Sequence, residues 1–218
     1  EGFKTLVALK RLHSGFALDQ YFIRQLVQEA KLLGQLQQNN IVRVHEFGYE
    51  NNQYYFTMDF VEGSSFETLL DDLDRDVRHG VTIVRDIARA LACAHRNGVI
   101  HRDLKPANIM LTGKDEPRVM DFGLAKRQAG EITMTMEGKV LGTPAYMPPE
   151  QARGEGFRVD GRGDIYSLGV ILYELLTGEL PFRGRTRMLL QQVINDEAPS
   201  PRKLNSSIPR DLETITLK

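Results

Sequence analysis

The chain has 218 residues, of which 41% are hydrophobic and 26% are charged, so it can bury a sizeable core in one or two domains. Its formal net charge of −1 provides no broad basic field, which excludes nucleic acid as a partner through electrostatics alone. Cys93 is the only cysteine, so no internal disulfide forms and a reducing, cytoplasmic setting is expected. No apolar run is long enough for a membrane span, so no membrane contact is expected from this segment, although an anchor outside it stays open.

The first sixty residues predict a small sheet with one helix. Their apolar spacing is typical of a strand, a helix and two further strands at residues 5–10, 18–38, 41–50 and 53–61. The last two strands are expected to form an antiparallel hairpin through the turn Asn51-Asn52. Glu29 lies on the buried stripe of the predicted helix.

The rest of the chain predicts a helical domain. Helices are indicated at residues 77–96, ending before Asn97-Gly98, and at residues 164–176, where the sequence is apolar nearly all round. Two short strands are expected at residues 108–112 and 118–122. The apolar residues of segment 124–150 show no regular spacing, so this segment is interpreted as a long functional loop.

The predicted plan is therefore an α+β protein with a small β-rich lobe and a larger helical lobe. We place the first lobe at residues 1–60 and the second at residues 61–218, with a hinge at residues 59–63. Both lobes are expected to be incomplete. The chain opens inside a strand, and residues 209–218 read as the start of a late helix.

Three motifs follow one another in the second part: HRDLKPAN at residues 101–108, DFG at residues 121–123 and GTPAYMPPE at residues 142–150. In the first part, Lys10 ends the string VALK. With these strings the sequence resembles the eukaryotic-like (Hanks-type) serine/threonine protein kinases, and the third motif is most similar to bacterial members. The resemblance runs from Lys10 nearly to the end of the chain. It implies the bilobal protein kinase fold and transfer of the γ-phosphoryl group of Mg-ATP to Ser or Thr hydroxyls of protein substrates.

Four residues of these motifs carry the implied chemistry. By resemblance, Asp103 accepts the proton of the substrate hydroxyl and Lys105 contacts the transferring phosphoryl group. Asn108 and Asp121 hold Mg²⁺, with Mn²⁺ as the alternative, which suits a hard cation that prefers oxygen ligands. Phosphoryl transfer needs charge neutralisation and in-line placement more than covalent chemistry. Lys105 favours serine/threonine over tyrosine specificity.

The resemblance also implies an ATP pocket. Lys10 pairs with the ATP phosphates and with Glu29, and this fits the sequence because a carboxylate on a buried stripe needs a cation. The implied adenine contacts are the side chains of Ala8, Met110 and the gatekeeper Met58, and the backbone of Asp59 and Val61.

Further residues are implied to shape and regulate the site. The structural ones are His101 and Phe122 in an apolar column with Leu33, Gly123 at a backbone turn, Asp164 bonded to the loop backbone, and Glu150 paired with a later arginine. Arg102 precedes the catalytic aspartate and calls for an anion, so Thr133 or Thr135 is expected to be autophosphorylated and to pair with it. Thr143 is expected to bond Asp103 and Lys105. The other histidines, His13, His45, His79 and His95, are interpreted as ordinary residues.

One departure from the pattern leaves a second function open. Only nine residues precede Lys10, and they contain no glycine-rich loop, so the segment is expected to bind ATP weakly by itself. An active kinase is favoured because its catalytic residues are present, and the alternative is a pseudokinase or signalling scaffold. The implied partners are ATP and protein substrates, and a homodimer is a further expectation from bacterial relatives.

Overall fold

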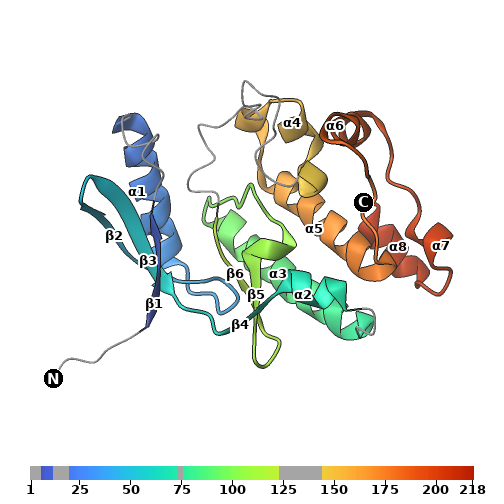
Figure 1. Ribbon diagram of the computed structural model, residues 1–218, viewed down its shortest axis with the longest axis horizontal. Helices are drawn as coiled ribbons and strands as arrows, with labels where there is room; N and C mark the ends of the chain where they lie inside the picture. Colours follow the sequence, from blue (N-terminus) through green and yellow to red (C-terminus); the bar gives the residue numbers. More distant parts are fainter. Residues whose placement is uncertain (1–5, 12–19, 73–75, 123–143) are drawn as a thin grey trace.

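The computed structural model describes residues 6–11, 20–72, 76–122 and 144–218, which form a small sheet-containing part and a larger helical part (Figure 1). The strands are β1 (Val7–Arg11), β2 (Val44–Glu50), β3 (Gln53–Asp59), β4 (Gly63–Ser65), β5 (Ile109–Thr112) and β6 (Pro117–Val119). The longer helices are α1 (Gln20–Gln35), α3 (Val77–Arg96), α5 (Gly161–Thr177) and α6 (Thr186–Asn195). The short helices are α2 (Phe66–Asp71), α4 (Pro149–Ala152), α7 (Pro201–Leu204) and α8 (Arg210–Thr216), with 3-10 turns at Pro106–Asn108, Pro144–Tyr146 and Gly156–Arg158.

The first sheet has the antiparallel strand order β1-β3-β2, and α1 lies against it (Figure 1). Asn51 and Asn52 form the β2–β3 turn with φ angles of 49° and 62°, the left-handed region that asparagine tolerates and that a tight hairpin requires. The β1–β3 register sets Ala8 opposite Met58 and Lys10 opposite Phe56. The predicted strands, hairpin and helix are therefore confirmed for the described residues.

A second sheet, β4-β5-β6, connects the two parts. The sequence suggests only that the preceding strand ends at Gly63. In the structure, residues 63–65 form the strand β4, which packs very closely on β5. A Cβ at residue 63 would lie 1.8 Å from the carbonyl oxygen of Leu111, so only glycine fits. On the other side of the sheet, the Val119 N–H donates to the Asn40 carbonyl at 2.7 Å, and the Val42 N–H donates to the Val119 carbonyl at 2.9 Å. The loop after α1 is thereby bonded to β6.

Helices α3 and α5 form the centre of the larger part. Asp76 caps α3 by accepting hydrogen bonds from the backbone of Arg78 and His79. Asp160 caps α5, which explains why this helix begins three residues before the predicted start. The predicted buried character of α5 is confirmed, because its residues Ile171 and Leu175 are fully buried.

The main hydrophobic core extends through both parts. Leu33 of α1 and Met58 of β3 belong to the same buried cluster as Phe66, Ile87 and Ile171 of the larger part. A smaller cluster around Phe182 and Leu189 lies under α4 and α6. Among the described residues, no helix combines the length and apolar composition needed to cross a bilayer.

Candidate active site

The loop of residues 101–108 follows α3 and leads into β5. A side chain of α5 forms hydrogen bonds to its backbone. The buried carboxylate of Asp164 accepts hydrogen bonds from the backbone N–H groups of His101 and Arg102, both at 2.8 Å. Arg102 has a φ of 63°, a costly conformation for a residue other than glycine. The two hydrogen bonds stabilise this strained backbone immediately before Asp103.

Within the loop, three predicted site residues lie together. The Asn108 amide nitrogen donates to the Asp103 carbonyl at 2.8 Å and lies 3.5 Å from its carboxylate. Lys105 Nζ lies 3.5 Å from Asp103 Oδ2. Pro106 opens the 3-10 turn that carries Asn108, where its fixed φ suits the first turn position. A carboxylate, an ammonium group and an amide therefore converge within one short segment.

Asp121 joins this group from the end of β6. The Met120 N–H donates to the Asn108 carbonyl at 3.0 Å, which brings the two predicted metal ligands onto neighbouring backbone segments. Asp121 has a φ of 59°, so the chain turns sharply at this residue. Lys10, from β1 of the first sheet, places its ammonium group 2.5 Å from Asp121 Oδ1. The site thus collects groups from both sheets.

The expected pair of Lys10 with Glu29 stays a prediction. Glu29 belongs to α1, but its side chain lies outside the described residues. The contact that the structure provides for Lys10 is the one with Asp121, and Lys10 Nζ also lies 6.0 Å from the centre of the Phe56 ring.

Asn108 and Asp121 are suitable ligands for a hard divalent cation. The amide nitrogen of Asn108 is bonded to Asp103, which leaves its amide oxygen as the group able to bind a cation. One carboxylate and one amide oxygen match magnesium sites completed by waters and phosphates. The described residues contain no cluster of three or more His, Cys, Asp or Glu side chains that could hold a metal without such additional ligands.

His101 supports the same site from the core. Its ring is fully buried and its centroid lies 4.7 Å from that of the Phe122 ring, and Phe122 belongs to the same buried cluster as Leu33. Its Nε2 lies 2.9 Å from the Met120 carbonyl, and its Nδ1 accepts a hydrogen bond from the Asp103 N–H at 3.3 Å. Burial lowers the pKa of His101, and the charge of Asp164 opposes this shift. The ring is therefore a neutral link between the Asp103 and Asp121 segments.

The residues assigned to the adenine pocket lie along both sheets. Ala8 and Met58 are cross-strand partners, and Met110 lies on β5 opposite Ser65. Val61 is partly buried in the connection between β3 and β4. The Asp59 N–H already donates to the Arg43 carbonyl, so an adenine contact from the Asp59 backbone has to use its carbonyl oxygen.

Other predicted residues are only partly described. Glu150 is half-buried at the start of α4, and no ion pair between it and an arginine occurs among the described residues. Burial, followed by the charge of Glu150, raises the pKa of the neighbouring Tyr166 to about 12. The predicted residues Gly123, Thr133, Thr135 and Thr143 lie outside the described residues.

Sequence reasoning missed three contacts around the site. His95 Nε2 lies 2.7 Å from Asp164 Oδ2, and His45 Nε2 lies 2.7 Å from the carboxylate of Asp59. Tyr146 donates from its hydroxyl group to Glu174 at 2.6 Å. No local pattern marks these contacts, because their partners are between 14 and 69 positions away in the sequence.

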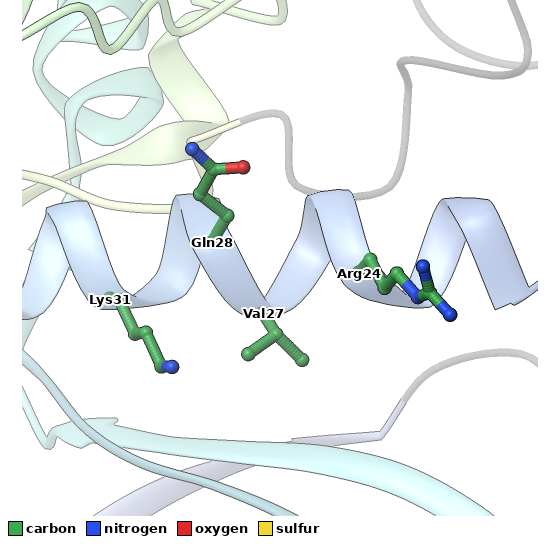
Figure 2. A pocket seen from close by; sticks show the side chains of 4 residues that line it. All are labelled: Arg24, Val27, Gln28 and Lys31. Carbon is green, nitrogen blue, oxygen red and sulfur yellow. The ribbon is translucent and has the colours of Figure 1, made fainter.

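A hollow of about 250 Å³ lies elsewhere, along α1 (Figure 2). Among the side chains that the structure describes, Arg24, Val27, Gln28 and Lys31 line it, and none of these four is a predicted site residue. We therefore locate the candidate active site from the converging chemical groups and not from this hollow.

Comparison with known proteins agrees with the geometry. The model of the protein kinase domain family matches residues 2–215. This chain belongs to the protein kinase family. The small sheet with α1 and the larger helical part are accordingly the two lobes of the protein kinase fold, which confirms the predicted fold class.

Bacterial kinases are among the most similar proteins. The chain is 37% identical over 97% of its length to a probable serine/threonine-protein kinase of Clostridium acetobutylicum, and equally to the serine/threonine-protein kinase PrkC of Bacillus subtilis. It covers 32% and 33% of those two proteins, so it spans about a third of their length. It is also 36% identical over its full length to the tyrosine-protein kinase MasK of Myxococcus xanthus, of which it covers 35%.

The fold is likewise that of a solved kinase domain. The crystal structure of the Mycobacterium tuberculosis PknI kinase domain matches with a TM-score of 0.72 and 27% sequence identity. The match covers 98% of this chain and 76% of the PknI chain.

The lowered pKa of His101 predicts a pH-dependent stability of the kinase domain. Below the ordinary histidine value of 6.5, the unfolded chain takes up a proton that the folded chain does not. The free energy of unfolding therefore falls as the pH drops through 6.5 toward the folded pKa, and His101 adds no pH dependence well above 6.5, where it is neutral in both states. Urea unfolding of the wild type and His101→Phe between about pH 7 and pH 5 should give a flatter pH profile for the variant. Parallel profiles would contradict the buried neutral ring.

Proposed function

We propose that this domain transfers the γ-phosphoryl group of ATP to serine and threonine hydroxyls of protein substrates. The observation that supports the proposal most directly is the convergence of Asp103, Lys105, Asn108 and Asp121 with Lys10 of the other lobe. Phosphoryl transfer depends on positioning and charge neutralisation, and this set supplies two carboxylates, two ammonium groups and an amide in one place.

Each residue has a distinct proposed role. Asp103 accepts the proton of the attacking hydroxyl, and Lys105, 3.5 Å from its carboxylate, neutralises charge on the transferred group. Asn108 and Asp121 hold Mg²⁺, or Mn²⁺ as the alternative, which supplies charge neutralisation at the phosphates when bound. Lys10 pairs with the phosphates and would then exchange its contact with Asp121 for them. Glu29 of α1 is the proposed ion-pair partner of Lys10 in that state.

The adenine ring is proposed to bind between the lobes. Ala8, Met58 and Met110 would supply its apolar surroundings, and the backbone of Asp59 and Val61 its hydrogen bonds. We also propose that the two lobes comprise residues 1–60 and residues 61–218. The proposed specificity for serine and threonine rests on Lys105 and on the similarity to PrkC, which is named a serine/threonine kinase, whereas MasK is named a tyrosine kinase. Tyrosine peptides therefore belong in the assay.

A pseudokinase or scaffold is the weaker alternative, because the residues that phosphoryl transfer needs are present and lie together. The proposed partners are ATP and protein substrates in the cytoplasm. Pairing of two copies during activation is a further proposal.

Replacing the proposed base tests the assignment directly. In the full-length protein, Asp103→Asn should lower kcat with radiolabelled Mg-ATP and a serine or threonine peptide by about 10²–10⁴-fold, because the amide cannot accept the proton. Asp211→Asn on α8, an exposed aspartate, is the matched control and should retain wild-type activity. Wild-type activity in Asp103→Asn would exclude the proposed role, and transfer to tyrosine alone would exclude the proposed specificity.

Loop phosphorylation is a separate prediction. We expect mass spectrometry of the active protein to find phosphate on Thr133 or Thr135, where it can pair with Arg102. The Thr133→Ala/Thr135→Ala variant should lose about tenfold or more in kcat, because the charge-assisted hydrogen bonds of the phosphate are absent. Thr214→Ala on α8 provides a threonine control outside the loop. An unmodified protein whose double variant is fully active would end this hypothesis.

A further inference from the structure

We propose that His45 is a positioning residue for nucleotide specificity, which makes the adenine pocket reject purines that carry an oxygen at position 6. It acts through Asp59, whose carboxylate it contacts and whose carbonyl oxygen is the proposed adenine contact. This role rests on the proposed function, because it concerns the nucleotide that the kinase site accepts. His45 has no distinctive sequence pattern, and its contact with a residue 14 positions away motivates the proposal.

A β-bulge directs the His45 side chain toward the end of β3. In the antiparallel register, Val44 lies opposite Met58 and Glu46 lies opposite Thr57. His45 is therefore an extra residue on β2. Such a bulge redirects side chains, and bulges are common beside active sites. His45 and Glu46 are both exposed, whereas consecutive side chains of a regular strand point to opposite faces.

The imidazole donates a hydrogen bond to the Asp59 side chain. His45 Nε2 lies 2.7 Å from Asp59 Oδ1, and an ionised carboxylate can only accept. A ring protonated at Nε2 donates this bond whether it is neutral or charged. Arg43, just before β2, also holds the backbone of Asp59, because its carbonyl accepts the Asp59 N–H at 3.0 Å. Asp59 is therefore held through its side chain and its backbone by one segment of the chain.

These two bonds matter because the first sheet ends at Asp59. It is the last residue of β3, and β4 begins only at Gly63. The next residue, Phe60, is 53% exposed, so it packs little against the sheet. The direction of the Asp59 carbonyl therefore depends on how firmly Asp59 itself is held.

A fixed carbonyl oxygen distinguishes purines by the group at position 6. Adenine carries an amino group there, which donates a hydrogen bond to the carbonyl, whereas hypoxanthine and guanine carry an oxygen, which is another acceptor. Two acceptors that face each other lose hydrogen bonds to water without replacing them, which is costly in a binding site. A carbonyl that can turn away avoids this cost and tolerates the oxygen. Holding Asp59 in place therefore excludes the wrong base as well as binding the right one.

The pair is too exposed to be important for folding. The His45 and Asp59 side chains are 35% and 48% exposed, and exposed pairs contribute little to the free energy of unfolding. Variants of His45 are therefore expected to fold, so a change in base preference can be separated from a loss of structure. His79 of α3 and Asp115 of the β5–β6 turn form a comparable exposed pair, with Nε2 3.3 Å from Oδ2. His79→Leu is accordingly the matched control.

The experiment measures the affinities of the full-length protein for ADP and for inosine 5′-diphosphate by titration calorimetry with Mg²⁺. The wild type should prefer ADP by about tenfold or more. His45→Leu should reduce this preference by about threefold or more, because one of the bonds that hold Asp59 is lost. His45→Gln retains a donor and should restore most of the preference. The His79→Leu control should have the wild-type preference.

A double-mutant cycle tests whether the two side chains act together. Asp59→Leu removes the carboxylate but leaves the backbone carbonyl in place, so it should reduce the preference by a factor similar to that of His45→Leu. The double variant should be no worse than either single variant, because the same contact is already lost. Additive losses would contradict a shared role.

An unchanged ratio of the two affinities in His45→Leu would overturn the proposal. So would an equal loss of affinity for both nucleotides, because this indicates a general weakening of the pocket. A wild type that binds neither nucleotide would refute the proposed kinase site together with this role. Because binding is measured without a protein substrate, absent phosphoryl transfer in a protein that prefers ADP would refute only the proposed activity.

Discussion

The burial of one carboxylate determines how the loop of residues 101–108 is held. Asp164 projects from the central helix α5 and accepts hydrogen bonds from the two backbone amides that precede Asp103. Because the carboxylate has almost no access to water, its bonds to the loop are not easily exchanged for solvent. The strained backbone at Arg102 is therefore supported by α5, a helix with many buried residues. Rigid support of this kind is what a positioning-dependent reaction requires.

The site also depends on connections between the lobes. The loop after α1 is bonded to β6 through Asn40 and Val42, and Asp121 follows β6 after a single residue. Lys10 approaches Asp121 from the first sheet, while the Met120 N–H donates to the Asn108 carbonyl beside strands β5 and β6 of the second. A shift of the small lobe would therefore be transmitted to the segment that carries a proposed metal ligand. The neutral His101 ring bonds the same segment from the core.

The sequence predicted the features that are local and missed those that are not. Apolar spacing, the helix end at Asn97-Gly98 and the asparagine turn located α3, α5 and the β2–β3 hairpin, because these signals act within a few residues. The motif residues of the site could be named because their order and spacing are characteristic. The strand β4 was missed because its glycine is required by a carbonyl on another strand. The contact of His95 with Asp164 was missed because the two residues are 69 positions apart in the sequence.

The central claim is that Asn108 and Asp121, with Lys10, form one binding site for a metal-bound nucleotide. Titration calorimetry of the full-length protein with ADP, with and without Mg²⁺, tests it independently of any substrate. We expect Mg²⁺ to strengthen ADP binding in the wild type, and Asp121→Asn to reduce that gain by about tenfold or more because a charged ligand is lost. Nucleotide binding that does not depend on Mg²⁺, or an unchanged gain in Asp121→Asn, would contradict the account.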